Sequence, residues 1–390
     1  MRHSRFTIRA GIIALTALLF GPFMAAPGSA AGDAIKIGVP VPLSGSYANA
    51  GIDILNGAKL AAERINASGG INGQKIEIVP EDDACDAQTA VQAAQKLIDE
   101  GVVAAAGGYC SSASLPELTT FHRANIPFAL DASTNPQLTE MGYDNVVRTI
   151  GRDDEQGPFA ANFIANALHA KTAAVIHDNT TYAKGLADNT VSALKTSGVR
   201  VVYDNAVTPG QADYTPTLTR VAGLNPDVIY YTGYFSEAGV LVKEARQLHM
   251  KGTFMGGDAT NDPTLIKTAG SAANGMIITT SPLAQFISGA HGFVQQYEKA
   301  YGHAPGPYSV YEYDAVGVMA QAIRNAKSTK SDKIIAALHQ IKNYHGLTGE
   351  IGFNAKGDRT KPAYITIIVK NEQFVPYQQL NAAGKWVVAK

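Results

Sequence analysis

The first third of the chain alternates short apolar segments with amphipathic stretches of helical period. Residues 35–41 alternate apolar and polar positions, which is typical of a strand. Apolar residues then recur at steps of three and four from Ile52 to Ile65, which predicts one buried helix stripe ending at the glycines near 68–70. Further strands are predicted at 74–79, 102–106 and 126–130, with helices between them.

A second series of the same kind begins near Arg152. Its strands are predicted at 172–177, 200–206, 227–232, 253–257 and 275–279, with helices between them. Three helices in close succession are predicted next, at 286–301, 308–326 and 332–341. One more strand is predicted at 365–370. Strands that alternate with helices predict right-handed βαβ units and parallel sheets. This many units exceeds one open sheet, so we expect an α/β fold with two doubly wound parallel-sheet lobes.

Composition excludes several classes of protein. The chain has 390 residues, a formal net charge of -1 and 46% hydrophobic residues. Two or three domains are expected at this length, and the hydrophobic share is too high for a disordered chain. The balanced charge argues against a nucleic-acid partner, which would require a basic surplus.

The N-terminus has the order of a secretory signal peptide. Arginines at positions 2, 5 and 9 precede an apolar run at 10–20, and small residues follow at 28–32. We expect residues 1–31 to be removed on export, with a membrane anchor as the alternative. No cysteine lies near the cut, so the mature protein is predicted to be periplasmic and not lipid-anchored.

Export makes the two cysteines informative. Cys85 and Cys110 are 25 residues apart, and in an oxidising compartment a single disulfide is the natural pairing. Closing that loop would contribute about 3–4 kcal/mol in the chain-entropy model. Two buried thiols are the alternative. The 9 histidines show no ligand spacing around the cysteines, so no metal is expected.

Catalytic and cofactor motifs are missing from the sequence. There is no G-x-S-x-G elbow, no phosphate-binding P-loop, and no G-x-G-x-x-G after the first strand. The acidic clusters at 81–83 and 153–155 are interpreted as a solvated loop or a helix N-terminus. These observations favour a binding protein without a cofactor over an enzyme.

Groups that suit a carboxylate follow two predicted strands. In open α/β sheets, ligands bind beyond the carboxyl ends of the strands. Ser111 follows the strand at 102–106 and opens a helix whose N-terminal amides suit an anion, although an ordinary helix cap is the alternative. After the strand at 126–130, the chain offers the Ala132 carbonyl and the Thr134 hydroxyl.

Three more candidates follow strands of the second series. Tyr182 comes after 172–177, Tyr234 after 227–232 and Asp258 after 253–257. Taken singly, a tyrosine here packs at a rim and an aspartate caps a helix. Together they supply an aromatic wall and an acidic partner for an ammonium group, as a pocket for an amino acid requires.

Distinctive segments spread over nearly the whole mature chain carry a resemblance. They are Ile35-Lys-Ile-Gly-Val, Leu43-Ser-Gly, the run Asn66 to Gly73, Asp82-Asp-Ala-Cys-Asp86, Cys110-Ser-Ser112, Asp153-Asp-Glu-Gln-Gly-Pro158, His177-Asp178, Tyr182-Ala-Lys-Gly-Leu-Ala187, Tyr230-Tyr-Thr-Gly-Tyr234 and Phe254-Met-Gly-Gly-Asp258. The sequence resembles the periplasmic leucine/isoleucine/valine-type amino-acid-binding proteins of ABC importers, which have the type I solute-binding fold.

The resemblance implies an architecture and a set of partners. It implies that Cys85 and Cys110 are bridged and that three crossings join two lobes, near 150–153, 279–282 and 353–360. Lobe 1 is then expected at 34–151 and 281–353, and lobe 2 at 152–280 and 354–390. It also implies a monomer that delivers an amino acid to ABC permease subunits by hinge closure.

The resemblance also implies roles for single residues. Ser111 and Thr134 look like carboxylate donors, Ala132 like a backbone contact, Tyr182 and Tyr234 like pocket walls, and Asp258 like the partner of the ammonium. Some relatives have Glu in place of Asp258. Ala50 stands where some relatives have a wall tyrosine, which Tyr47 could replace.

Other functions fit parts of the same pattern. The fold suits a receptor for an aromatic acid or an amide, or a sensory receptor subunit that is not coupled to import. An exported hydrolase would use Ser111 as its nucleophile and would need a histidine base within hydrogen-bond reach. His122 lies about three turns along the same predicted helix, and His177 belongs to the other series.

Overall fold

The computed structural model describes residues 1, 3, 7 and 33–389. The predicted signal peptide at 1–31 therefore lies outside the described residues, apart from three isolated positions, and stays a prediction. Among the described residues, no helix combines the length and the apolar character needed to cross a membrane.

Lobe 1 is built on a five-stranded parallel sheet. Its strands, in spatial order, are β2 (Ile76–Asp82), β1 (Ile35–Val41), β3 (Ala104–Gly107), β4 (Phe128–Leu130) and β5 (Val146–Arg148). Its helices are α1 (Ala48–Ala67), α2 (Ala87–Asp99), α3 (Ser111–Arg123), α4 (Gln137–Glu140), α10 (His291–Tyr301), α11 (Ser309–Ala326) and α12 (Ser331–Leu338). The spatial order 2-1-3-4-5 is that of a doubly wound sheet, with its switch point between β1 and β3.

Lobe 2 is built on an eight-stranded sheet that begins with the same order. Its parallel strands are β7 (Arg200–Ala206), β6 (Thr172–His177), β8 (Val228–Tyr231), β9 (Thr253–Gly256) and β10 (Ile277–Thr280). Its helices are α5 (Asp153–Asn162), α6 (Thr181–Thr196), α7 (Thr215–Leu224), α8 (Phe235–Gln247) and α9 (Pro263–Ala269). The switch point of this sheet lies between β6 and β8, and the predicted α/β class with parallel-sheet lobes is confirmed.

The far edge of the second sheet is antiparallel, which the sequence pattern does not reveal. The strands β13 (Ile365–Lys370), β14 (Gln373–Leu380) and β15 (Trp386–Val388) follow one another in hairpin order after β10. Of these, β13 is predicted because it is a buried apolar run. The other two are missed, since β14 contains a proline and does not alternate apolar with polar positions, and β15 has three residues.

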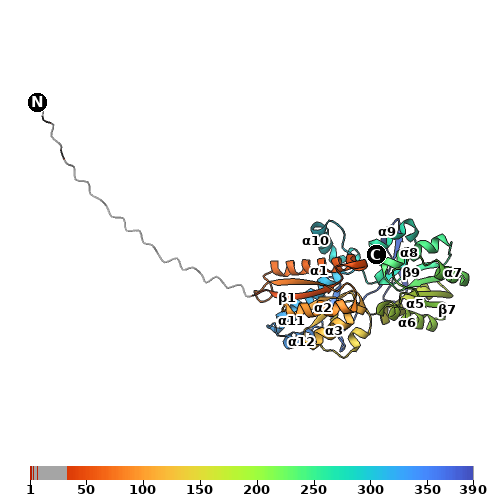
Figure 1. Cartoon of the computed structure of the whole chain (residues 1–390), viewed down its shortest axis with the longest axis horizontal. Helices are drawn as coiled ribbons and strands as arrows, with labels where there is room; N and C mark the ends of the chain where they lie inside the picture. The colour runs from red at the N-terminus through yellow and green to blue at the C-terminus, as the bar shows by residue number, and fades with distance from the viewer. Residues whose placement is uncertain (2, 4–6, 8–32, 390) are drawn as a thin grey trace. The chain divides into compact units, whose positions relative to one another are not determined.

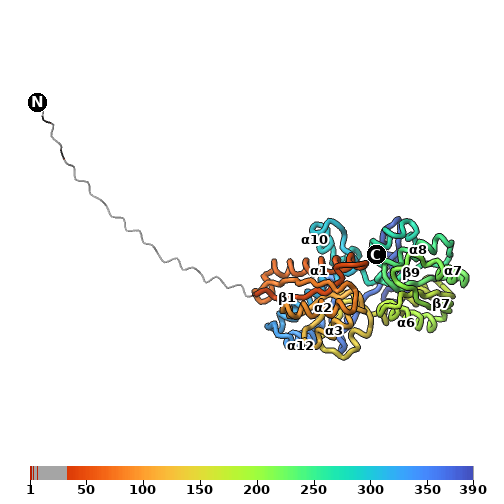
Figure 2. Tube along the Cα trace, viewed as in Figure 1, coloured from red at the N-terminus to blue at the C-terminus, as the bar shows by residue number. Residues whose placement is uncertain are grey.

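The chain passes between the two sheets three times. It leaves the first sheet after β5, returns to lobe 1 after β10, and re-enters the second sheet at β13. The late helices α11 and α12 accordingly lie in the same lobe as β1 and α1 (Figure 1), and Figure 2 shows these blue and red segments together. The residue limits of the two lobes given above stay a prediction.

Two further contacts complete the framework. Cys85 and Cys110 form the predicted disulfide, with their Cα atoms 5.4 Å apart, and join the loop after β2 to the residue before α3. In lobe 2, Trp386 of β15 donates from Nε1 to Asn162 Oδ1 at 2.9 Å and packs against Phe163. A small hairpin of β11 (Tyr344–Gly346) and β12 (Gly349–Ile351) precedes the third passage.

Candidate functional site

The candidate residues gather at the carboxyl ends of strands beside both switch points. In lobe 1, the loop after β3 ends at Ser111, the first residue of α3. In lobe 2, Tyr182 lies in the first turn of α6 after β6, and Tyr234 precedes α8 after β8. Crevices at switch points are where doubly wound sheets bind ligands.

Asn135, the residue after Thr134, links Thr134 to Ser111. Both are buried, and Ser111 Oγ accepts a hydrogen bond from the backbone N–H of Asn135 at 3.4 Å. The Thr134 hydroxyl is buried without a hydrogen-bond partner among the described residues. Ala132 is buried in the same hydrophobic cluster as Tyr182 and Tyr234.

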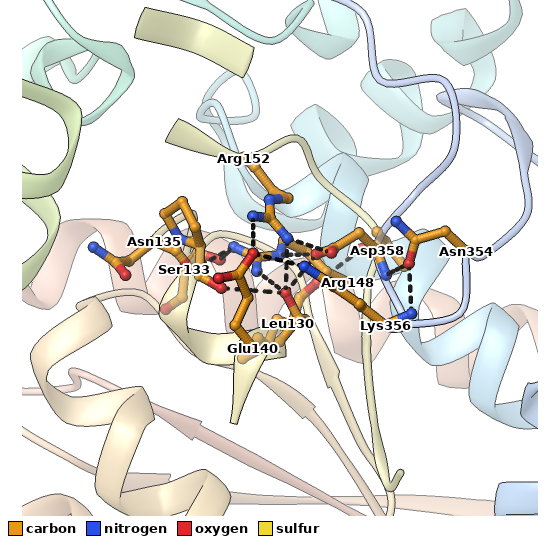
Figure 3. A network of polar contacts seen from close by, with 12 residues as sticks. Leu130, Ser133, Asn135, Glu140, Arg148, Arg152, Asn354, Lys356 and Asp358 are labelled. Carbon is orange, nitrogen blue, oxygen red and sulfur yellow. Dashed lines mark hydrogen bonds and ion pairs between the residues drawn. The ribbon is translucent and has the colours of Figure 1, made fainter. Parts of the chain in front are cut away.

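Arg148 holds the loop that presents Thr134. Its buried guanidinium donates to the carbonyls of Ser133 and Asn135, at 3.2 and 3.0 Å, on either side of Thr134 (Figure 3). The same side chain forms an ion pair with Asp358 at 3.1 Å. The position of the Thr134 hydroxyl is therefore fixed by charged groups that lie away from the cleft.

Asp258 lies at the end of β9 and accepts hydrogen bonds from both lobes. Tyr182 of lobe 2 donates to Asp258 Oδ1 at 2.7 Å, and Tyr308, which precedes α11 in lobe 1, donates to Oδ2 at 3.5 Å. The Asp258 side chain is 3% exposed. Burial raises the pKa of Asp258, although the Tyr182 hydrogen bond opposes that shift.

Aromatic rings surround this carboxylate. Tyr234 packs against Tyr182 with ring centroids 5.2 Å apart, and against Tyr109 at 5.6 Å. Tyr109 in turn contacts Tyr308 at 5.5 Å. Because Tyr109 and Tyr308 belong to lobe 1 and the other two to lobe 2, the rings form one wall across the cleft. The hydroxyl of Tyr234 is buried without a partner among the described residues.

Asp153 is a member of the site that the sequence analysis misses. The interpretation of 153–155 as a helix N-terminus is right, because Asp153 opens α5, but a solvated position is wrong for this residue, which is fully buried. Its backbone N–H donates to the Thr134 carbonyl at 3.1 Å. Neither carboxylate oxygen has a hydrogen-bond partner among the described residues. Burial and the nearby Asp258 carboxylate hold the pKa of Asp153 well above its ordinary value.

Close contact between the lobes explains how Asp153 reaches the site. Asn135 of lobe 1 donates from its side chain to the Thr181 carbonyl of lobe 2 at 2.8 Å. Gly185, one turn after Tyr182, leaves room for this contact, since a Cβ there would collide with the Asn135 amide and lie 3.6 Å from Asp153 Oδ2. The position of Asp153 at the end of the first expected crossing could have pointed to the cleft. It was passed over because acidic residues at the start of a helix are usually exposed.

The assembled groups suit a small solute that carries both charges. Hydroxyl and amide donors lie at the start of α3, two buried carboxylates lie across the cleft, and tyrosine rings line it. Among the described residues, neither Asp153 nor Asp258 forms an ion pair with a cationic side chain. The two histidines considered as bases have other contacts, His122 with Asn145 and His177 with the Asn179 backbone.

Comparison with known proteins agrees with this geometry. The family model described as periplasmic binding protein matches residues 34–373. The chain belongs to this family. An "Amino acid binding protein" from Pseudomonas aeruginosa is 35% identical over 336 residues, which cover 85% of this chain and 89% of the relative.

Two further relatives extend the comparison. The leucine-specific-binding protein of Salmonella typhimurium is 32% identical over 358 residues, 92% of this chain and 94% of the relative. The crystal structure of the branched-chain amino acid transporter substrate binding protein LivJ from Streptococcus pneumoniae, in complex with isoleucine, superposes with a TM-score of 0.82 at 28% identity. That comparison covers 88% of this chain and 98% of the other. Family and relatives are solute-binding proteins, and membership implies an extracytoplasmic location.

Proposed function

We propose that this periplasmic binding protein takes up an amino acid, branched-chain or related, in its interlobe cleft and delivers it to an ABC permease. The observation that carries the proposal is Asp258, a buried carboxylate with tyrosine donors from both lobes and no cationic side chain bound to it among the described residues. The relatives named above, which bind amino acids, support the same ligand class.

Each end of an amino acid has a complementary partner in this arrangement. The carboxylate fits the N-terminus of α3, where the Ser111 hydroxyl and the first backbone N–H groups of the helix are donors and the helix dipole favours an anion. The Thr134 hydroxyl, which has no hydrogen-bond partner among the described residues, is a second donor. The ammonium fits between Asp258 and Asp153, because a cation lowers the cost of keeping two buried carboxylates ionised.

The same charges argue against an aromatic acid as the ligand. A solute with a carboxylate and no cation would leave Asp153 and Asp258 uncompensated in a dry site, and that costs several kcal/mol or forces protonation. A sensory subunit of the same fold would bind the same solutes. Co-purification with permease subunits supports import, whereas capture of a sensor protein in their place supports the sensory role.

We propose that the protein closes around its ligand. Side-chain hydrogen bonds already cross the cleft from Asn49 to Asp262, from Asn135 to Thr181 and from Tyr308 to Asp258. A ligand held by Ser111 on one side and Asp258 on the other adds contacts to this state alone. It therefore shifts the population toward the closed form by its differential affinity. We propose that a monomer performs this cycle in the periplasm after removal of the signal peptide.

The test is the affinity of an Asp258→Ala variant for amino acids. We expect calorimetry to show binding weakened by at least about 2 kcal/mol, roughly thirtyfold, because the ammonium loses its charged acceptor. Asp188→Ala is the matched control, since Asp188 is exposed on α6 and forms its ion pair with Lys184, away from the cleft residues. Equal affinity in Asp258→Ala and the control would remove Asp258 from the site and the proposal with it.

A further inference from the structure

A short segment of lobe 1 reaches across to lobe 2 beside the candidate site. Residues 45–49, which we call the strap, contain the short helix η1 (Gly45–Tyr47) and the start of α1. Within the strap, the Tyr47 ring lies 4.7 Å from the ring of Tyr234, centroid to centroid, and 5.9 Å from that of Phe235. Asn49 donates from its amide to both oxygens of Asp262, at 3.1 and 3.0 Å.

The strap touches lobe 2 at segments that carry candidate ligand-binding residues. Tyr234 is one of the tyrosines around Asp258, and Asp262 is four residues after Asp258 on the same loop. Tyr47 also faces Tyr109 at 6.2 Å, two residues before Ser111. Tyr234 and Tyr109 thus lie between the Tyr47 ring and the two tyrosines that donate to Asp258, so Tyr47 forms the end of the aromatic wall away from that carboxylate. This is where the side chain of an amino acid held at Asp258 would extend.

The position of the Tyr47 ring is fixed by the backbone around it. The first turn of α1 packs directly on the end of β1, because a Cβ at Gly51 would collide with the Pro42 carbonyl. Asn49, two residues after Tyr47, is hydrogen-bonded to the other lobe. Ala50 is buried and carries no ring, so Tyr47 is the aromatic residue that this part of lobe 1 brings to the cleft.

We propose that Tyr47 limits the length of the ligand side chain, so that amino acids with short side chains bind more tightly than leucine. The inference rests on the function proposed above. Rings with centroids 4.7 Å apart are in van der Waals contact, and a longer side chain must separate them. Packed protein interiors resist such insertion, and one methylene in a tight pocket changes discrimination by roughly 10–200-fold.

The experiment measures alanine and leucine affinity by calorimetry for the full mature chain and for three variants. In the wild type we expect alanine to bind at least about tenfold more tightly than leucine. Tyr47→Ala should lower this ratio by at least about tenfold, through a gain in leucine affinity. Tyr47→Phe keeps the ring and should keep the ratio of the wild type.

Asn49→Ala is the matched control on the same segment. It removes the hydrogen bonds to Asp262 and leaves the ring wall, so it should weaken both ligands equally and leave the ratio unchanged. A ratio in Tyr47→Ala equal to that of the wild type, with both ligands bound, would overturn the inference and leave the proposed function standing. Failure of the wild type to bind any amino acid would overturn the proposed function and this inference together.

Discussion

At the residue scale, the unusual feature is a set of buried acidic side chains that form no ion pair with a cationic side chain among the described residues. Asp83, in the loop before the disulfide, is fully buried, and one of its oxygens accepts only the Cys85 backbone N–H, at 2.7 Å. Glu117 of α3 is also fully buried, and neither of its oxygens has a partner among the described residues. The interpretation of 81–83 as solvated is thus wrong for Asp83. Burial, opposed by the Cys85 hydrogen bond, raises the pKa of Asp83 to about 7.

This raised pKa predicts a pH-dependent stability. The folded state keeps the proton on Asp83 up to about pH 7, whereas the unfolded state loses it near the ordinary value of 3.8. Asp83 therefore lowers the free energy of unfolding progressively as pH rises from about 4 to 7. Asp83→Asn cannot ionise, so its melting temperature should exceed that of the wild type by a margin that grows from pH 4 to pH 7 and then stays constant.

Calorimetric melting across that pH range checks the prediction. Asp99→Asn is the control, because Asp99 is exposed at the end of α2 and its replacement should shift melting little at any pH. A margin for Asp83→Asn that is flat between pH 4 and pH 7 contradicts the prediction. Glu117, whose pKa burial and Asp83 also raise, adds a dependence of the same sign.

At the residue scale, the sequence yields a candidate where a polar side chain directly follows a predicted strand. Ser111, Thr134 and Asp258 were found in that way, and the structure brings them to one cleft. Asp153 and Tyr308 were missed because neither directly follows a predicted strand, and each lies at the start of a helix. Their place in the cleft depends on how two sheets dock, which no local pattern encodes. The ligand roles of all these residues stay predictions.

At the scale of elements, one buried carboxylate joins α1 to α11. Asp53, inside α1, accepts backbone hydrogen bonds from Gly306, Tyr308 and Ser309, at 2.8, 3.2 and 3.0 Å. The Tyr297 hydroxyl donates to it at 2.9 Å. Since α11 begins at Ser309, the carboxylate caps that helix and sets the position of Tyr308 beside Asp258.

Asp53→Ala should therefore be costly in two ways. Three backbone N–H groups, two of them buried, would lose their acceptor, and we expect the free energy of unfolding to fall by about 3 kcal/mol or more. Amino-acid affinity should fall as well, because Tyr308 is no longer held. Urea denaturation and calorimetry measure the two effects. Glu63→Ala, on the exposed face of the same helix, should change neither, and an Asp53→Ala protein of unchanged stability would contradict the prediction.

Elements with a clear apolar period were predicted well, and the others were not. The strands β1, β6, β7 and β13 have the bounds that the pattern predicts. β5 has three residues, and the β11–β12 hairpin lies on the surface with few buried positions, so neither has a pattern to read. β5 forms by pairing with β4, and β11 pairs with β12 in a local hairpin, and strands of three residues have too few positions to show an apolar period.

At the scale of the whole molecule, one ion-pair network joins the passages between the lobes. Asp358, on the third passage, pairs with Arg148 of β5 at 3.1 Å and with Arg152 of the first passage at 2.6 Å. Arg152 extends the network to Glu140 and to Asp154, the second residue of α5 (Figure 3 shows the part around Glu140). The loop that presents Thr134 and two of the three passages therefore share one set of charges.

Removing Asp358 should destabilise the fold strongly. Asp358→Ala leaves the fully buried Arg148 without its counter-charge, and we expect a loss of about 3–5 kcal/mol in the free energy of unfolding. Urea denaturation measures this loss. The exposed pair of Lys184 and Asp188 provides the comparison, because Asp188→Ala should cost less than about 1 kcal/mol. Similar losses in the two variants would show that the buried network contributes no more than a surface pair.

The place of the sole tryptophan determines which optical signal can follow binding. Trp386 is docked on Asn162 and Phe163 at the outer edge of the second sheet, among strands that contribute nothing to the cleft. Its emission therefore reports the attachment of the C-terminal strands. The phenol rings around Asp258 are the chromophores that we expect a bound solute to touch, so tyrosine difference absorbance is the spectroscopy suited to titrating this protein.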